Sequence, residues 1–180
     1  MNLVSKLMSV LVVAAGSMQM LSAQQKGRIV VPAERVLPMA TTLSAISASP
    51  ATISFTATDP DLGPFAGNSS ATVSWSTSGG SAGSTWTLKV QASAATFASC
   101  GTVPTSAVKA TCTGVAGGSA GTCGAAVNLS TSAQQVASGN EASGAGKAYS
   151  VTLNFSLADS WSYIANSSCS LTLTYTVTAP

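Results

Sequence analysis

The end of this chain alternates strictly between hydrophobic and hydroxyl side chains. Leu171, Leu173, Tyr175 and Val177 occupy every second position, and threonines occupy the positions between and after them. Successive side chains of an extended chain point to opposite faces, so this pattern predicts a strand with one buried and one wet face. The C-terminal residues are therefore expected to complete a hydrophobic core.

The same two-residue period recurs along most of the chain. Besides the terminal run, it covers residues 52–57, 72–76, 86–91, 108–112, 123–129 and 148–158. Stretches rich in Gly, Pro, Asn and Ser separate these runs. The sequence therefore predicts an all-β fold, an antiparallel β-sandwich of seven or eight strands that is Ig-like or pilin-like, with a closed barrel as the alternative.

Two strand pairs are expected from the order of the runs. The stretch SGGSAGS predicts a hairpin between residues 72–76 and 86–91, and the strong run at 148–158 is expected to pair with the terminal strand. Residues 132–147, which are mostly polar, are predicted to form a long loop.

The N-terminal segment differs in composition from the rest. Lys6 precedes an apolar stretch over residues 7–15, and small residues lead up to Ala23, which is typical of a cleaved signal peptide. A membrane anchor would need about 20 apolar residues in a row, and Gln19 interrupts this stretch earlier. The predicted parts are a signal peptide at 1–23, an N-terminal arm at 24–43 and one β-sandwich domain at 44–180.

Four cysteines follow the predicted cleavage site: Cys100, Cys112, Cys123 and Cys169. An even number in an exported chain predicts two disulfides, for which three connectivities exist. We favour Cys112 with Cys123, which flank a Gly-rich turn and would close a local hairpin, and Cys100 with Cys169 by elimination. A metal site is disfavoured because the chain has no Cys-x-x-Cys spacing and no histidine.

Charged side chains are rare. They make up 7% of the residues, the formal net charge is +2 and histidine is absent, which argues against a nucleic-acid partner and excludes a Ser-His nucleophile. Of the five acidic side chains, Glu34 lies in the arm and Glu141 in a predicted flexible loop, where neither suits acid–base catalysis. We expect no enzyme activity and no cofactor.

The stretch DPDLGP contains one acidic cluster, formed by Asp59 and Asp61. An extended backbone would direct both carboxylates to one side, where calcium could bind them together with backbone carbonyls. The alternative, which we favour, is an Asx-type turn before a proline. The pair is therefore a weak calcium candidate.

The tryptophans divide into two groups. Trp75 and Trp86 fall on the hydrophobic phase of their runs and are expected in the core. Trp161 and Tyr163 lie in an irregular segment, where they could form a carbohydrate-binding face or fold over the end of the core. We keep both as candidate ligand-binding residues.

Two stretches resemble the WxL family of bacterial cell-surface domains. Trp86 and Leu88 match that family's first Trp-x-Leu motif, and Phe155 and Leu157 lie in an alternating strand like the second motif, with phenylalanine where the family has tryptophan. The resemblance covers the last half of the chain. It implies a non-catalytic β-sandwich that attaches to the cell wall.

The chain is also similar to secreted fimbrial subunits, whose N-terminal arms complete a neighbour's sheet by strand addition. Lys89 and Lys109 are nearly the only charges in the predicted strands, so sheet edges are weakly protected against pairing with other chains. Pro32 and Pro38 remove hydrogen-bond donors from the arm, and a clean alternating donor strand is missing unless it is the stretch TTLSAISAS at 41–49, so the sequence leaves open whether the arm is a donor strand.

These patterns predict a secreted, non-enzymatic structural or adhesive protein of a cell envelope or extracellular surface. It would be extracellular, at the cell surface or in the periplasm, and its expected partners are a cell-wall polymer, a glycan or another surface protein. The alternatives are a pilin-like subunit that polymerises by strand addition and a carbohydrate-binding module. No membrane span is expected once the signal peptide is removed.

Overall fold

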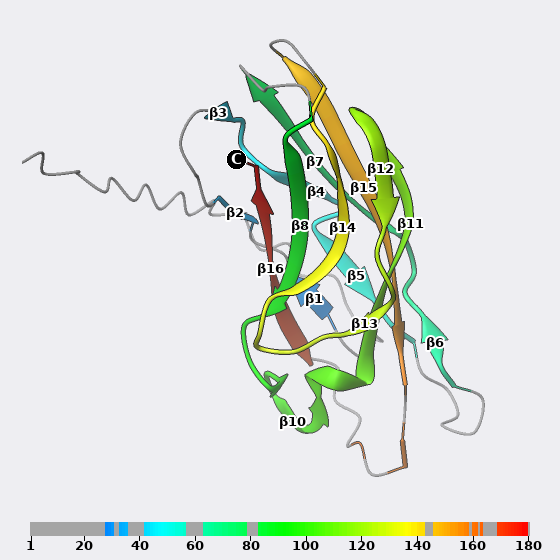
Figure 1. The fold of residues 1–180 in the computed structure, drawn as a ribbon. Helices are drawn as coiled ribbons and strands as arrows, with labels where there is room; N and C mark the ends of the chain where they lie inside the picture. The colour runs from blue at the N-terminus through cyan, green and yellow to red at the C-terminus, as the bar shows by residue number, and fades with distance from the viewer. Residues whose placement is uncertain are drawn as a thin grey trace, which may run out of the picture.

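The computed structural model shows a chain that consists mostly of antiparallel β-sheets (Figure 1). It describes residues 28–30, 33–35, 42–56, 63–78, 83–142, 146–158, 160, 161, 163 and 169–179. Sixteen strands lie in this part of the chain, more than the seven or eight predicted, because several are only two or three residues long. The predicted signal peptide lies outside the described residues.

The first large sheet has seven strands, with the C-terminal strand near its middle. Its order is β12-β14-β8-β16-β1-β5, and β2 also pairs with β16. The strands are β12 (Ser119–Cys123), β14 (Gln134–Asn140), β8 (Thr85–Ala92), β16 (Ser170–Thr178), β1 (Arg28–Val30), β5 (Thr52–Ser54) and β2 (Ala33–Arg35). The strands β1 and β2 run parallel to β16, and the other pairs are antiparallel.

The second large sheet also has seven strands, all paired antiparallel. Its order is β13-β11-β15-β7-β3, with β4 paired to β7 and β6 paired to β15. The strands are β13 (Val127–Asn128), β11 (Val108–Ala116), β15 (Lys147–Leu157), β7 (Ala71–Ser78), β3 (Thr42–Leu43), β4 (Ser47–Ser49) and β6 (Phe65–Ala66).

A small hairpin, separate from both large sheets, lies between β8 and β11 in the sequence. The strands β9 (Thr96–Phe97) and β10 (Cys100–Pro104) pair antiparallel, and a 3-10 turn at Thr105–Ala107 leads into β11. Phe97 and Cys100 are buried, so this hairpin packs against the rest of the protein.

The alternation seen in the sequence becomes the alternation of burial. In β8, β15 and β16 every second side chain is buried in one hydrophobic cluster. Leu173, Tyr175 and Val177 of β16 are fully buried, as predicted for the terminal run. The two sheets contact each other in this cluster, since the rings of Trp75 in β7 and Trp86 in β8 lie 5.1 Å apart at 72°.

Both predicted strand pairs are wrong. The strands β7 and β8 belong to different sheets, where β7 pairs with β15 and β8 pairs with β14 and β16. The strands β15 and β16 are likewise in different sheets. Alternation indicates which face of a strand is buried and does not specify its neighbour, so consecutive strands can lie on opposite sides of a core.

The predicted polar loop at 132–147 contains a strand, β14. Its hydrogen-bond register shifts between Gln135 and Ala137, which places the adjacent residues Val136 and Ala137 both in the core. A bulge of this kind interrupts the two-residue period. The strand was therefore not recognisable from alternation.

Candidate functional site

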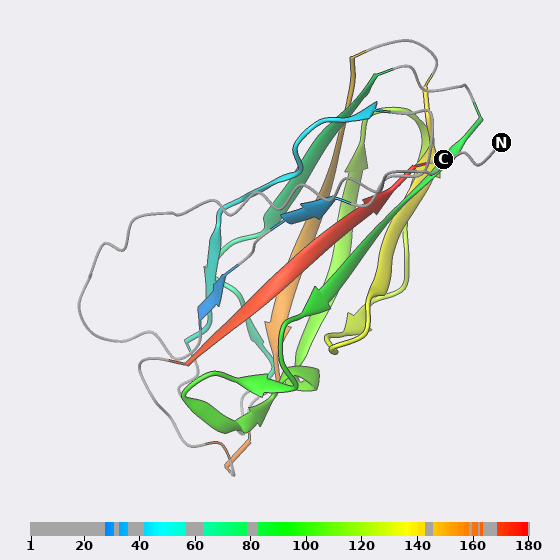
Figure 2. The same ribbon diagram turned by 90° about the vertical axis from the view of Figure 1, so that its left-hand side faces the viewer.

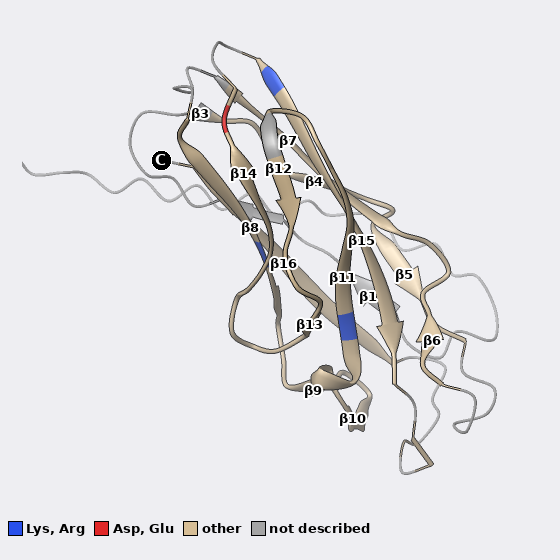
Figure 3. Cartoon of the chain, turned by 45° about the vertical axis from the view of Figure 1, so that its right-hand side comes forward, with Lys and Arg blue, Asp and Glu red and all other residues tan. Residues whose placement is uncertain are grey.

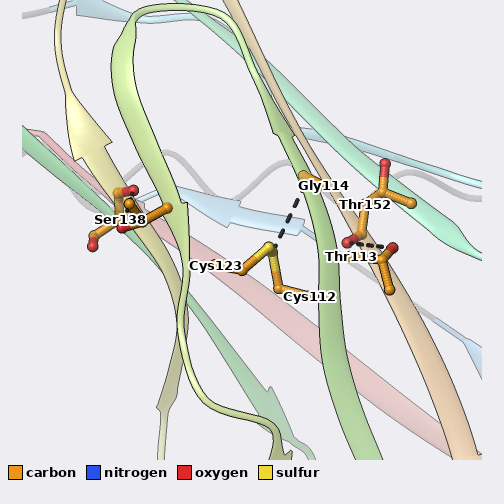
Figure 4. Close-up of a disulfide and its surroundings, with 7 residues drawn as sticks. Cys112, Thr113, Gly114, Cys123, Ser138 and Thr152 are labelled. Atoms are coloured by element: carbon orange, nitrogen blue, oxygen red, sulfur yellow. Dashed lines mark hydrogen bonds between the residues drawn. A yellow bond between two sulfur atoms is a disulfide. The ribbon is translucent and has the colours of Figure 1, made fainter.

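One edge of the first sheet is closed covalently. Cys112 in β11 and Cys123 in β12 form a disulfide, as predicted, but β11 belongs to the second sheet and β12 to the first (Figure 4). The bond therefore joins two sheets instead of closing a paired hairpin. We call this side of the molecule, formed by β11, β12 and β13, the stapled edge.

The second predicted disulfide, between Cys100 and Cys169, is also present. It ties β10 to the residue that precedes β16, across a sequence separation of 69 residues. Ala98 and Ser170 exchange backbone hydrogen bonds beside it, of 2.8 and 3.2 Å. The start of the central strand is thus fastened both covalently and by the backbone. Two disulfides suggest a non-reducing, extracellular setting.

At the opposite edge, the N-terminal arm enters the first sheet. The strand β1 lies between β16 and β5: Ile29 is opposite Leu171 on one side and opposite Ile53 on the other. Figure 2 shows the blue arm strands beside the long red β16. In the described part of the chain, β1 is the strand that connects β5 to its sheet. We call the space between β5 and β16 the arm seat.

The arm pairs a second time with β16, through β2. Ala33, Glu34 and Arg35 run parallel to Tyr175, Thr176 and Val177. Pro32 falls between the two paired triplets, so its missing N–H removes no donor from them.

The alternating stretch at 41–49 pairs within its own chain. Its Thr42–Leu43 and Ser47–Ser49 both lie against β7 in the second sheet. The arm strand was missed at the sequence level because three residues are too short to show a period. The consecutive β-branched residues Ile29, Val30 and Val31 are the signal that could have found it.

The two strand lysines named from the sequence both lie in interior strands, where they cannot protect a sheet edge. Lys89 lies in β8 between β14 and β16, and Lys109 lies in β11 between β13 and β15. Figure 3 shows how sparse charge is over the described part of the molecule. In the first sheet, the disulfide holds the edge strand β12, and the arm strand β1 holds the edge strand β5.

One part of the outer face of the second sheet carries small, neutral side chains, whereas exposed Lys109 lies on the same face toward the start of β11. Ser47, Ser74, Ser150 and Ala116 form one row across four strands. An open hollow of about 520 Å³ lies over this part of the sheet. The serine hydroxyls and backbone groups that line the hollow can form hydrogen bonds with a ligand. None of the lining residues is charged, so the hollow does not favour a charged ligand.

The hollow is lined by residues of four segments. They are Ser44, Ala45, Ser47, Ser74, Trp75, Ser76, Ala116, Gly117, Ala148, Tyr149 and Ser150.

The structure separates the two aromatic candidates. Trp161 is 75% exposed, whereas Tyr163 is half-buried and packs against the core. They therefore do not present two rings to solvent together. Trp75 and Trp86 are buried, as predicted, and both contact the ring of Tyr149.

The polar residues Glu141 and Tyr175 are both fully buried. Glu141, predicted in a flexible loop, is fully buried at the end of β14, and its backbone N–H donates to the carbonyl of Ser84. Tyr175 is fully buried with no hydrogen-bond partner for its hydroxyl, and burial raises its pKa well above the usual range. Its phenol therefore stays neutral in the folded protein.

Asp59 and Asp61, the weak calcium candidates, lie outside the described residues. Within the described ranges, no three His, Cys, Asp or Glu side chains gather into a metal site. The same part of the chain contains no helix of the length and apolarity needed to cross a membrane.

The residues that resemble the WxL motifs all lie in the core. Trp86 and Leu88 are fully buried in β8, and Phe155 and Leu157 are buried in β15 of the other sheet. No family model, no curated protein and no solved structure matches this chain. The attachment to a cell wall that the resemblance implies stays a prediction.

Proposed function

We propose that this chain is a secreted, non-enzymatic structural or adhesive component of a cell envelope or extracellular surface, and that its two large sheets form a β-sandwich. The contact of Trp75 with Trp86 and the Cys112–Cys123 bond support the sandwich, since each joins the two sheets. Two disulfides and a sparsely charged, hydroxyl-rich exterior suit a protein that persists outside the cell.

The observation that carries the proposal is the neutral, hydroxyl-rich part of the second sheet's outer face around the hollow. Two rows cross β4, β7, β15 and β11 here, Ser47–Ser74–Ser150–Ala116 and Ser49–Thr72–Thr152–Gly114, and the hollow lies over this part of the sheet. The uncharged hydroxyl and backbone groups that line the hollow can contact an uncharged polymer by many weak hydrogen bonds, each contributing about 0.5–1.5 kcal/mol. The function would then be contact over an area, without a catalytic step.

Co-sedimentation with insoluble cell-wall polymers and polysaccharides tests this proposal. The variant Ser74→Lys with Ser150→Lys places two charges opposite each other on the proposed contact face. The matched control, Gln91→Lys with Thr174→Lys, places the same pair on the outer face of the other sheet. We expect the first variant to lose binding and the control to keep it. Equal binding by both variants, or no binding by the native protein to any polymer, would overturn the proposal.

A carbohydrate-binding module is the second candidate, and the exposure of Trp161 favours it. An exposed indole stacks on the apolar face of a sugar ring. Glycan-array binding that is lost in Trp161→Ala and kept in Tyr163→Phe would support this candidate. Unchanged binding in Trp161→Ala would remove it.

A further inference from the structure

We propose that the arm seat accepts the N-terminal arm of a second copy of this chain, so that copies join by exchanging arms. This inference rests on the proposed structural role and names the partner and the site of contact. The seat is one strand wide, because β1 alone lies between β5 and β16 in the described chain. Whatever fills it must be an extended segment that pairs on both sides.

The arm is attached to the first sheet by short strand contacts only. Each contact is a triplet of residues, at Arg28–Val30 and Ala33–Arg35, and the pairing with β16 is parallel. Parallel pairing is slightly less stable per residue than antiparallel pairing. All four cysteines lie between residues 100 and 169, so no disulfide holds the arm in place. The arm can therefore leave the seat without breaking a covalent bond.

The seat and the segment that fits it are present in every copy. Ile29 is paired in register with Ile53 on one side and Leu171 on the other, and both of these residues are buried in the core. An arm from another copy would form the same backbone pairs as the chain's own arm. Exchange of arms would link two molecules while each seat keeps the same strand contacts. Swapping an identical element is therefore a low-cost route to assembly.

The linker decides how strongly the chain prefers its own arm. Residues 36–41 join β2 to β3, and six residues span at most about 20 Å. A short linker gives the chain's own arm an effective concentration on the order of millimolar. Exchange is therefore expected when copies are crowded, as on a surface, and is expected to be slow and rare in dilute solution.

Mixed cysteine variants test whether one copy's arm occupies another copy's seat. Arg28 lies opposite Ser54, at a spacing between paired antiparallel strands that a disulfide can bridge. The chain from Gln24 onward is prepared separately as R28C and as S54C, and the two are mixed, incubated over a range of concentrations and oxidised. Asn128 in β13, at the stapled edge, provides the matched control N128C in place of S54C.

We expect the R28C and S54C mixture to form at least about tenfold more covalent heterodimer than the R28C and N128C mixture, rising with concentration as for a bimolecular exchange. Mass spectrometry of proteolytic fragments verifies that the introduced sulfurs are joined and the native disulfides are intact. The double variant R28C/S54C, oxidised in dilute solution, is expected to close within the monomer.

Two results would overturn the inference. Heterodimer no more abundant than in the control at every concentration, with the double variant closing internally, would show that the arm stays in its own seat. Failure of the double variant to close would show that the arm does not occupy the seat at all. Neither result touches the proposed function, because a monomer that still binds wall polymers through Ser74 and Ser150 keeps the structural role.

Discussion

The two edges of the first sheet are held by interactions of different kinds. At the stapled edge, the bond between Cys112 and Cys123 joins β12 to the neighbouring sheet. At the arm edge, β5 is connected to the sheet by three residues of the arm. A disulfide stabilises a fold whatever the protein concentration, whereas a paired strand can be replaced by an identical strand. The difference suggests that one edge serves stability and the other serves contact between molecules.

The strand β16 separates the two edges, so removing its second half is expected to have the largest effect. Deletion of residues 174–180 removes the buried side chains of Tyr175 and Val177 and the pairing positions of β2. The loss exceeds about 5 kcal/mol, which is comparable to the whole stability of a domain. We expect no cooperative thermal unfolding transition by circular dichroism. A transition like that of the full chain would contradict this.

Removing each disulfide measures how much that covalent bond contributes to stability beyond strand pairing and packing. Replacing Cys100 and Cys169 by alanine is expected to cost about 4 kcal/mol, and replacing Cys112 and Cys123 about 3 kcal/mol, because their sequence separations are 69 and 11 residues. Chemical unfolding measures both. If the shorter loop proves the more costly, the sheet-to-sheet connection contributes more than the loop-closure entropy.

Packing under the stapled edge can be tested without touching a cysteine. A Cβ at Gly139 would lie 2.6 Å from the ring of Trp86 and 2.9 Å from the backbone of Gly121. Overpacking of this kind costs about 1–3 kcal/mol, so Gly139→Ala should lower the free energy of unfolding by that amount. Gly101→Ala is the control, since its Cβ would meet nothing within 4 Å. Equal stability of the two variants would argue against this packing.

Deleting the arm, residues 24–41, tests the other edge. Six paired residues are lost, against the entropy regained by the freed arm, and we expect a net loss of about 1–2 kcal/mol. The exposed edge of β16 should also make the shortened chain aggregate at high concentration. Light scattering and thermal unfolding measure the two effects. If arm deletion lowered the free energy of unfolding by more than removal of either disulfide does, the arm edge would contribute more to stability than the stapled edge.

The smallest expected effect concerns Tyr175, whose buried hydroxyl has no hydrogen-bond partner. Tyr175→Phe should raise the free energy of unfolding by about 1 kcal/mol, because an unsatisfied buried group is removed. Its raised pKa also predicts a pH effect. Above about pH 10 the unfolded chain releases the phenol proton while the folded chain keeps it, so native stability falls there, and the variant should lose less. Parallel losses in both proteins would contradict the assignment.

Several features of the fold were predictable from the sequence, and others were not. Alternation identified the buried faces of the long strands, including Tyr175 and Val177, and the Gly-rich stretch between Cys112 and Cys123 indicated their pairing. The candidate site was less accessible. The alternating stretch at 41–49 pairs with β7, whereas the strands that enter the first sheet at β16 are Arg28–Val30 and Ala33–Arg35, which show no alternation. Exposed Trp161 was a candidate, but its separation from Tyr163 required coordinates.

The sequence by itself determined the β class, the core-facing phase of the long strands and the oxidised cysteines, because these depend on local period, local composition and the number of cysteines. Only the tertiary structure decided which strands are neighbours, that the Cys112–Cys123 bond joins two sheets, and that the arm lies beside β16. Backbone hydrogen bonds between strands are alike at every position. Their partners are therefore chosen by how the whole set of buried faces packs together, which no single stretch of sequence contains.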